Sequence, residues 1–554
     1  MRLPPSIRIA TAPKTGGNPG NLGNGMNIPP RVIPARTILL FACALIITTY
    51  ALMIDLKGIS TDEGVRLAVI NGGQPFTIAQ PAVYAGWDDV LEANRPLAYQ
   101  PLYYLLQNTL MRIAGTQNVI FFRLLNLACL GLCLQGLLTL SRDWRLMPRL
   151  FLLGLFAFNA YLFMHVLQIR EYIAGVAFYI WSTWVVLELD RRRLAHPWAD
   201  VAWFAGYGVL LTLGFYLQTW IVFPAIGQFL FLCLRRGDQR LRFYAHLALS
   251  YVITVSTTWP YLGTNQQKIN IGLWASENES LWVHLADGFQ LVLSGHLAGH
   301  SLFTDFLSCF WLAVIISGTS LVLRRKNLPV NTAMPAGEYL RQGRLMGLCI
   351  AVSLTFQLGY YYRVENLSLW PRYFVIHYFF VTWLVALVFK YLWDLRRDGG
   401  LAGWPRRGLT VAVGLILAML TTSAFYQIRS YYRNPLLDTG FSAVSSWRNV
   451  AADMARFLRP ADAVVTYDFI NRSTLTFTRP IANPVLLLPE LETSNLSAVE
   501  RLVYLEPAAT RTQRGELAAR LQALGFPTMQ EKILHTPDGV HEVKDWRVLL
   551  FERP

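Results

Sequence analysis

Residues 37–56 read TILLFACALIITTYALMIDL, and the ten residues that follow read KGISTDEGVR. The first segment is apolar over about 20 residues, the length needed to cross a bilayer as a helix. Similar runs recur along the chain, which has 554 residues, 54% of them hydrophobic and 15% charged. Since a soluble globular chain carries roughly 25% charged residues, the composition predicts a polytopic α-helical membrane protein.

Apolar runs of membrane-spanning length predict about eleven transmembrane helices. Their expected positions are 37–56, 119–140, 150–168, 172–189, 201–217, 219–234, 244–262, 305–323, 345–360, 373–392 and 408–427. Residues 1–36 are rich in Gly, Asn and Pro, so we expect a disordered cytoplasmic tail. We expect the first helix to act as a signal anchor rather than a cleaved leader.

The formal net charge is +15, but Lys and Arg fall in short clusters between apolar runs. This placement disfavours a nucleic-acid binder and follows the rule that positive loops stay in the cytoplasm. All clusters fall on one side of the membrane if the N-terminus is cytoplasmic and the number of spans is odd. Three segments are then extracytoplasmic: 57–118, 263–304 and the residues after about 429.

The composition changes after the last predicted span. Strand-like runs at 463–469, 485–488 and 502–505 accompany helical patterns at 443–458 and 513–524, and a final strand pair is expected around Pro537-Asp538-Gly539. Strands interspersed with helices are typical of an α/β domain. We therefore expect a transmembrane domain at 37–428 and a small soluble extracytoplasmic α/β domain at 429–554.

Two adjacent carboxylates, Asp62 and Glu63, follow the first predicted span. A carboxylate in a partly desolvated pocket can act as the general base for an acceptor hydroxyl. A structural alternative is equally consistent with the spacing, because Ser60 and Glu63 match a capping box and Asp62 and Arg66 lie four residues apart on the following helix. If Glu63 only caps a helix, Gln can replace it.

The same loop continues with an aromatic segment, residues 95–106, RPLAYQPLYYLL. Prolines before an aromatic, apolar run predict a helix at the membrane surface, where Tyr is favoured. Tyr99 and Tyr103 are candidates for a substrate groove, as is Arg66 in the preceding segment. An ordinary belt of interfacial aromatic residues is the alternative.

Two arginines lie where predicted spans meet the extracytoplasmic side. Arg170 lies between the third and fourth spans, two residues before Tyr172, and Arg372 lies at the start of the tenth, next to Tyr373. A guanidinium group is planar, always charged and able to bind two phosphate oxygens. These four residues are candidates for substrate binding. Pairing of Arg170 with Glu171, or anchoring at the interface, are the alternatives.

No metal site is predicted. His296 and His300 have helical i,i+4 spacing, but no third ligand is evident near them. The six cysteines fall inside predicted helices and are interpreted as apolar packing residues. The sequence indicates no particular cofactor, and it leaves open whether a divalent metal is required.

The ordered set of these motifs resembles the dolichyl-phosphate-mannose-protein mannosyltransferase-like superfamily of GT-C glycosyltransferases, which includes bacterial aminoarabinose and galacturonic acid transferases of lipid A and lipopolysaccharide core. The motifs are Asp62-Glu63, residues 96–106, residues 123–126, residues 170–172 and Arg372-Tyr373. The resemblance spans roughly residues 37–430. One departure is that many relatives have His-Pro-Pro-Leu-Tyr where this chain has Tyr-Gln-Pro-Leu-Tyr at 99–103.

The resemblance implies a GT-C fold in the bacterial inner membrane and an inverting transfer of sugar from a polyprenyl-phosphate donor to an envelope glycan, lipid or protein. It implies that Asp62 is the catalytic acidic residue, Glu63 its companion, and Arg372 a contact of the carrier phosphate. A transporter or flippase, a polymerase or ligase of lipid-linked saccharides, and a non-catalytic scaffold are alternatives. Transporters usually carry charged residues or broken helices near the midplane, whereas the predicted spans are nearly free of charge at their centres.

The first prediction concerns topology. Because the basic clusters alternate with weakly charged connections, a reporter fused to the C-terminus should show periplasmic activity. A C-terminal reporter active only in the cytoplasm would contradict the orientation on which every candidate site depends.

Overall fold

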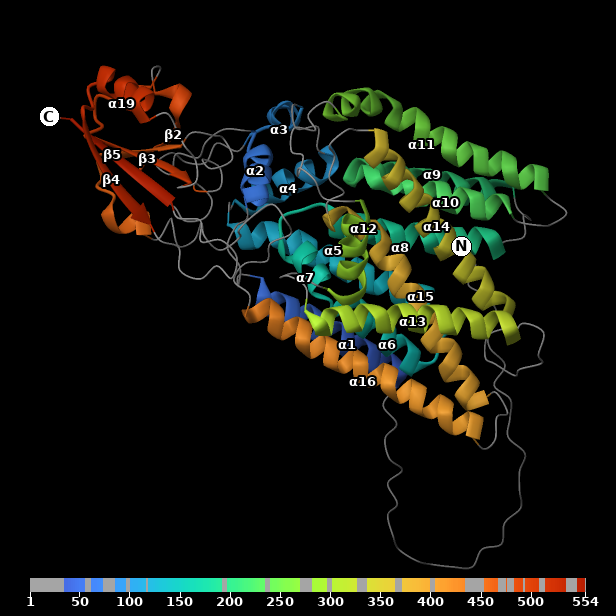
Figure 1. Ribbon diagram of the computed structural model, residues 1–554. Coiled ribbons are helices and arrows are strands. Elements are labelled where there is room, and N and C mark those ends of the chain that lie inside the picture. Colours follow the sequence, from blue (N-terminus) through green and yellow to red (C-terminus); the bar gives the residue numbers. More distant parts are fainter. Residues whose placement is uncertain are drawn as a thin grey trace, which may run out of the picture.

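Figure 1 shows a computed structural model of the chain. It describes residues 34–54, 61–72, 85–95, 100–115, 118–191, 197–234, 240–269, 281–295, 301–325, 336–363, 371–398, 404–433, 453–466, 475, 483–491, 494–507, 514–534 and 546–553. The predicted tail, apart from its last residues, lies outside these ranges, as do Tyr99, His296 and His300.

A helical bundle occupies most of the chain. Their bounds are α1 Ala35–Met53, α2 Thr61–Ile70, α3 Trp87–Asn94, α4 Pro101–Ala114, α5 Val119–Leu140, α6 Leu146–Ala157, α7 Ala160–Leu167, α8 Tyr172–Arg191, α9 Pro197–Leu217, η1 Thr219–Ile221, α10 Val222–Cys233, α11 Arg240–Ile269, α12 Leu281–Ser294, α13 Leu302–Arg325, α14 Ala336–Arg363, η2 Pro371–Phe374, α15 Val375–Asp398 and α16 Trp404–Arg433.

Every predicted span overlaps a helix of this bundle. Among the described residues, seven helices are long and apolar enough to cross a membrane, or eight if the bent pair α6–α7 is one span. The prediction of one continuous helix over 150–168 was wrong, because α6 and α7 meet at an angle of 64°. The predicted fold class, a polytopic helical membrane protein with a small C-terminal sheet, is confirmed.

At the bend between α6 and α7, side chains form hydrogen bonds with the backbone groups that the break leaves without helical partners. Asn159 caps α7, since its Oδ1 accepts from the N–H of Tyr161 at 2.8 Å. Tyr50 of α1 donates to the carbonyl of Ala157 at 2.6 Å, and Gln427 of α16 accepts from the N–H of Ala160 at 3.2 Å. Because lipid offers no hydrogen bonds, a break in a membrane helix requires such partners.

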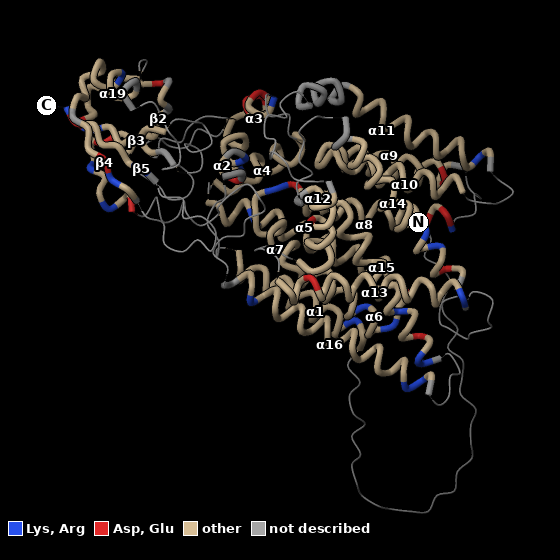
Figure 2. The backbone as a smooth tube through the Cα atoms, in the orientation of Figure 1, with Lys and Arg blue, Asp and Glu red and all other residues tan. Residues whose placement is uncertain are grey.

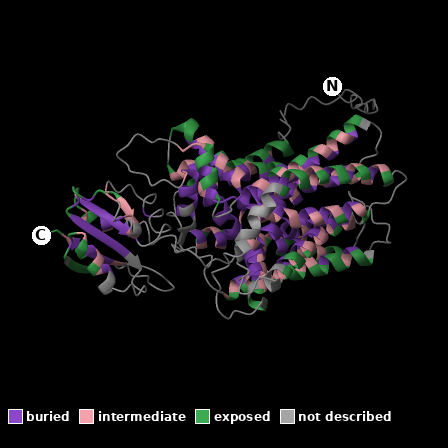
Figure 3. Ribbon diagram, turned by 90° about the horizontal axis from the view of Figure 1, so that it is seen from above, coloured by how far each residue is buried: buried purple, intermediate pink, exposed green. Residues whose placement is uncertain are grey.

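The bundle has central and peripheral helices (Figure 3). In their most apolar windows, α15 is 89% buried and α8 is 78% buried, whereas α1, α13 and α16 are each 22% buried. The central helices are therefore covered by protein, and the outer ones present apolar surface that suits lipid.

A buried ion pair within the central helix α15 is hydrogen-bonded to a tyrosine of α14. Lys390 donates to Asp394 at 2.6 Å and to the hydroxyl of Tyr339 at 2.7 Å, and the Tyr339 hydroxyl donates to the same carboxylate at 2.7 Å. Lys390 and Asp394 are 1% and 0% exposed. Since each buried charge has a partner, the pair tolerates burial, and the hydroxyl of Tyr339 fixes α14 against α15.

The C-terminal residues form a five-stranded sheet at one end of the bundle (Figure 1). The elements are β1 Asp462–Thr466, β2 Val485–Leu487, η3 Leu488–Glu490, β3 Arg501–Pro507, α19 Arg514–Ala523, β4 Thr528–Leu534 and β5 Trp546–Glu552. The strand order is β2-β1-β3-β5-β4, with β1 parallel to β2 and β3, and β5 antiparallel to both β3 and β4. The expected final strand pair is β4–β5.

The strands alternate their buried side chains between two faces, as the two-residue period requires. Val464, Val503 and Val548 pack on one face, and Val465, Tyr504 and Leu549 pack on the other, where Leu517 and Leu521 of α19 cover them. Both faces are thus closed, and the sheet has its own core apart from that of the bundle.

Candidate functional site

The candidate site lies around α2, the helix that follows α1, at the end of the bundle nearer to the sheet (Figure 1). Asp62 is the second residue of α2, and its side chain lies outside the described residues, as do those of Thr61 and Val65. The described partners of α2 come from Glu63 and Arg66.

Glu63 is fully buried and paired with Arg123 of α5, which is 1% exposed. Arg123 donates from Nη2 to Oε1 at 3.1 Å and to Oε2 at 3.4 Å, and from Nε to Oε1 at 3.3 Å. Its Nη1 donates to the carbonyl of Ile54, just after α1, at 2.8 Å. One guanidinium therefore fixes α2 to α5 and to the end of α1.

Glu63 also accepts a hydrogen bond from the N–H of Ile169, at 2.8 Å. Ile169 belongs to the link 168–171, the four residues between α7 and α8. The carboxylate of Glu63 thus binds a buried arginine and a buried backbone N–H, and helix capping alone does not account for it. The alternative in which Glu63 is only a replaceable cap is not supported.

Arg66 extends the same connection one turn further along α2. Its Nε lies 3.4 Å from Oε2 of Glu171 in the link, and both side chains are nearly buried, at 5% and 6% exposed. The charges of Glu63 and Arg66 thus face opposite charges on α5 and on the link. α2 is held by attraction at two successive turns.

The link 168–171 is held from a third direction by α4 and α5. Asn126 of α5 donates to the carbonyl of Gln168 and accepts from the hydroxyl of Tyr103 of α4, at 2.9 Å for the latter. Gln107 donates to the same hydroxyl at 3.1 Å. Burial raises the pKa of Tyr103 well above its usual value, which keeps the phenol protonated and able to donate.

The two tyrosines at the start of α4 therefore face inward. Tyr103 and Tyr104 are both fully buried, and their rings meet edge to face with centroids 5.6 Å apart. The alternative of an ordinary belt of interfacial aromatic residues does not fit these two buried residues. The physical reason is that the Tyr103 hydroxyl finds its partner in the bundle.

Arg170 and Tyr172 lie in and beside the link. Arg170 is fully buried, which excludes the alternative of a snorkelling anchor at the interface. Tyr172 begins α8 and its ring lies edge-on to His165 of α7, with centroids 4.9 Å apart and planes at 67°. Arg66, Arg123 and Arg170 thus bring three guanidinium groups to the surroundings of one short link.

Arg372 lies in η2, the turn that precedes α15, and its side chain lies outside the described residues. Its neighbour Tyr373 stacks on Trp220 of η1, with ring centroids 5.0 Å apart and planes at 24°. Gln100, just before α4, donates to Thr219 of the same turn η1. The turns η1 and η2 and the start of α4 are thus joined.

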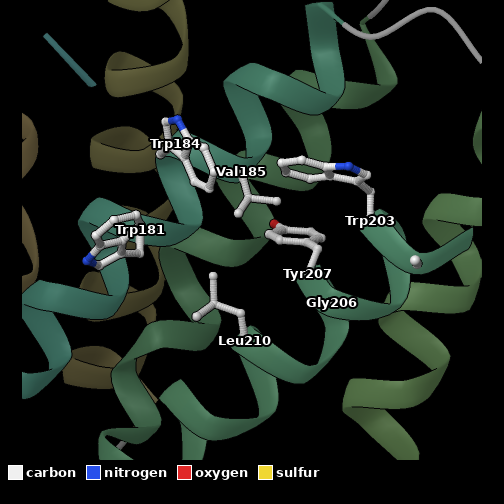
Figure 4. A pocket seen from close by; sticks show the side chains of 8 residues that line it. Trp181, Trp184, Val185, Trp203, Gly206, Tyr207 and Leu210 are labelled. Atoms are coloured by element: carbon white, nitrogen blue, oxygen red, sulfur yellow. The ribbon is translucent and has the colours of Figure 1, made fainter. Parts of the chain in front are cut away.

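A pocket of about 420 Å³ lies elsewhere, between α8 and α9 (Figure 4). Trp181, Trp184, Trp203 and Tyr207 dominate its lining, and none of its lining residues is charged. It therefore offers contacts for hydrocarbon and no group for phosphate binding or proton transfer.

No group of three or more His, Cys, Asp or Glu that could hold a metal ion occurs among the described residues. The predicted pair His296 and His300 lies outside them. The chemistry that the described site can provide is therefore that of guanidinium cations, carboxylates and tyrosine hydroxyls.

The sequence interpretation gave no role to Arg123, Asn126 or Gln168. A signal was present, because Arg123 and Asn126 are polar residues inside an apolar run, and such residues are usually paired or functional. Their partners could not be identified, since Glu63 lies 60 residues from Arg123 and Gln168 lies 42 residues from Asn126.

No protein-family model and no curated protein matches the chain. Among solved structures, ArnT from Cupriavidus metallidurans in the apo state aligns with a TM-score of 0.53 at 12% identity, covering 93% of this chain and 98% of that protein. The same ArnT bound to undecaprenyl phosphate aligns with a TM-score of 0.49 at 13% identity and the same coverage. The arabinofuranosyltransferase AftD from Mycobacteria aligns with a TM-score of 0.49 at 13% identity, covering 94% of this chain and 40% of that protein.

These proteins are GT-C glycosyltransferases. The likeness to apo ArnT covers nearly the whole of both chains. The chain therefore has the GT-C fold, as its motifs led us to expect.

The site generates a prediction on stability. Glu63→Gln keeps the size of the side chain but leaves the buried Arg123 without its counter-charge, so we expect a loss of roughly 3–5 kcal/mol. The melting temperature in detergent should fall clearly, and Glu63→Gln combined with Arg123→Met should recover part of the loss. Glu92→Gln, which changes an exposed carboxylate of α3, is the matched control. Wild-type melting of Glu63→Gln would contradict the anchoring role.

Proposed function

We propose that the protein is an inverting glycosyltransferase that moves a sugar from a polyprenyl-phosphate donor to an extracytoplasmic glycan, lipid or protein. In this proposal Asp62 is the general base and Arg372 binds the carrier phosphate. The observation that carries it is the buried attachment of α2, because Glu63 and Arg123 fix the helix on which Asp62 lies.

The two carboxylates have separate roles in this proposal. Glu63 is already engaged with Arg123 and with the N–H of Ile169, so taking up a proton there would break a buried ion pair. Asp62 is its neighbour on the same helix and is assigned the proton transfer. For a general base, the position relative to the acceptor hydroxyl is the first requirement, and a shifted pKa is the second.

The chemical step conserves atoms and charge. The acceptor hydroxyl attacks the anomeric carbon from the face opposite the phosphate, and its proton passes to Asp62. The bond between the anomeric carbon and the phosphate oxygen breaks, and its electron pair remains on the phosphate. Negative charge that builds on the departing oxygen is stabilised by fixed cations, a role we assign to Arg372 and Arg170.

Tyrosines and Arg66 complete the assignment. Tyr373 and Tyr172 flank the two phosphate arginines, and Tyr99 and Tyr103 belong to the segment that begins α4. Tyr103 is buried and its hydroxyl donates to Asn126. We therefore assign it a supporting role, which is to hold Asn126 in place against the link. Arg66 holds the link through Glu171, which makes it a positioning residue as well as a candidate contact.

The membrane orientation is part of the proposal. Figure 2 shows Lys and Arg gathered at the ends of α11, α13 and α16 that lie away from the sheet. If these ends are cytoplasmic, then α2, η2 and the sheet are extracytoplasmic. The donor follows from the same setting, because a lipid-linked phosphate reaches such a site from the membrane. ArnT, which shares the fold, has a structure bound to undecaprenyl phosphate.

A transporter of lipid-linked sugars is the second candidate, and the bend of α6 and α7 favours it, since broken helices mark substrate sites in transporters. Against it, this is the one broken span among the described residues, whereas transporter folds usually repeat the feature in both halves. The two candidates differ in outcome, because only the enzyme makes a covalent product in detergent.

The central test is transfer by purified protein in detergent. With a polyprenyl-phosphate sugar and candidate acceptors, we expect a glycosylated product by mass spectrometry, and none from a nucleotide sugar. Asp62→Asn should lower the rate by at least roughly a hundredfold, with unchanged melting temperature, because the amide cannot accept the proton. Full activity of Asp62→Asn would remove it as the base, and transfer from a nucleotide sugar alone would reject the donor class.

Arg372 gives a second, graded test in the same assay. Arg372→Lys keeps one positive charge but loses the two-pronged geometry, so the KM for the donor should rise. Arg372→Ala should lower turnover by an order of magnitude or more if the phosphate contact strengthens in the transition state. If both variants turn over normally, Arg372 is an interface anchor.

A further inference from the structure

Two buried polar residues lie behind the turn η2 and have no role in the assignment above. Gln357 lies on α14 and His377 lies on α15, and both are fully buried. His377 Nε2 is 2.8 Å from Oε1 of Gln357, and Nε2 of Gln357 donates to the carbonyl oxygen of Tyr373 at 3.0 Å. The three groups form a chain that ends on the residue after Arg372.

The direction of the hydrogen bonds in this chain follows from its last member. A carbonyl oxygen only accepts, so the amide NH₂ of Gln357 must face Tyr373. The amide oxygen then faces His377, and the histidine must donate from Nε2. Nδ1 of His377 is left without a hydrogen-bond partner among the described residues. The imidazole lies beside the rings of Phe289 and Phe374, with ring centroids 5.6 and 5.7 Å from its own. Among the described residues, the imidazole therefore makes its one hydrogen bond to Gln357.

The turn η2 is also held by packing on both of its last residues. Tyr373 stacks on Trp220. Phe374 is fully buried and lies so close to Gly288 of α12 that a Cβ on this glycine would be 2.3 Å from the ring. Stacking and packing define where these rings lie, and the Gln357 amide adds a directional bond to the backbone between them.

We propose that Gln357 and His377 are positioning residues for donor binding, which hold η2 so that Arg372 meets the carrier phosphate. This proposal rests on the proposed function. A guanidinium that binds two phosphate oxygens depends on orientation as well as charge. A displacement of about 1 Å can cost roughly a hundredfold in rate. Burying polar side chains so deeply costs free energy, and such residues are usually hydrogen-bonded and functional.

The test compares kinetic constants of variants in the purified protein. Gln357→Leu removes the hydrogen bond to the Tyr373 carbonyl at similar side-chain volume. His377→Phe keeps an aromatic ring at the position but cannot donate a hydrogen bond to Gln357. We expect the KM for the polyprenyl-phosphate donor to rise about tenfold in Gln357→Leu and less in His377→Phe. The KM for the acceptor should stay within about twofold of the wild type.

The control is Ser353→Ala, one turn earlier on the same face of α14. Ser353 is fully buried, and its hydroxyl has no hydrogen-bond partner among the described residues. This variant removes a buried polar group of the same helix without touching η2, so its donor KM should equal that of the wild type. An equal rise in Ser353→Ala would show that any polar loss in α14 has the effect and would reject the proposal.

A double-mutant cycle separates positioning from general support of the fold. If Gln357 acts through Arg372, then Gln357→Leu should change the donor KM by less than about twofold when Arg372 is already Ala. The same factor in both backgrounds would mean that Gln357 only supports the fold. A wild-type donor KM in Gln357→Leu, while Arg372→Ala is impaired, would reject this inference and leave the proposed function standing. Normal turnover by Arg372→Ala would instead reject the phosphate role of Arg372 itself.

Discussion

The hydrogen-bonding demand of four non-helical residues inside a helical bundle determines how the rest of the site is built. Residues 168–171 interrupt the path from α7 to α8, and lipid offers their backbone groups no partners. The Ile169 N–H is taken by Glu63, and the Gln168 carbonyl is taken by Asn126. Because these partners lie on α2 and α5, satisfying the link also brings those helices together.

The charges of the site follow from this arrangement. Glu63 is buried and requires a counter-charge, which Arg123 supplies. Glu171 in the link forms an ion pair with Arg66. An ion pair with a missing partner would cost several kcal/mol, so α2 cannot leave its place without breaking two of them. In the proposed enzyme this rigidity locates the base. The turn η2, held by Gln357, Trp220 and Gly288, locates the phosphate contact. The buried polar groups thereby position the residues of the proposed site.

Periodicity and composition were enough to predict the positions of the long apolar helices, the C-terminal strands and the strand pair β4–β5, because each depends on local patterns. They did not predict the helices α3 and α12, which lie in segments expected to be loops. They were not enough to predict the bend at Asn159, since the apolar run from 150 to 168 is continuous and the capping partners come from α1 and α16. The candidate carboxylates and Arg170 could be named from sequence. The pairing of Glu63 with Arg123 could not, because buried ion pairs depend on tertiary approach across 60 residues, and the same holds for Gln357 with His377 across 20.

In the proposed enzyme a lipid-linked phosphate binds beside α2 and η2. The most direct measurement is a cryo-electron microscopy structure of the purified protein with a polyprenyl monophosphate. We predict phosphate density within about 3 Å of the guanidinium nitrogens of Arg372, on the same side of the bundle as Asp62. Phosphate density remote from both α2 and η2, with the lipid bound only in the aromatic pocket between α8 and α9, would contradict it.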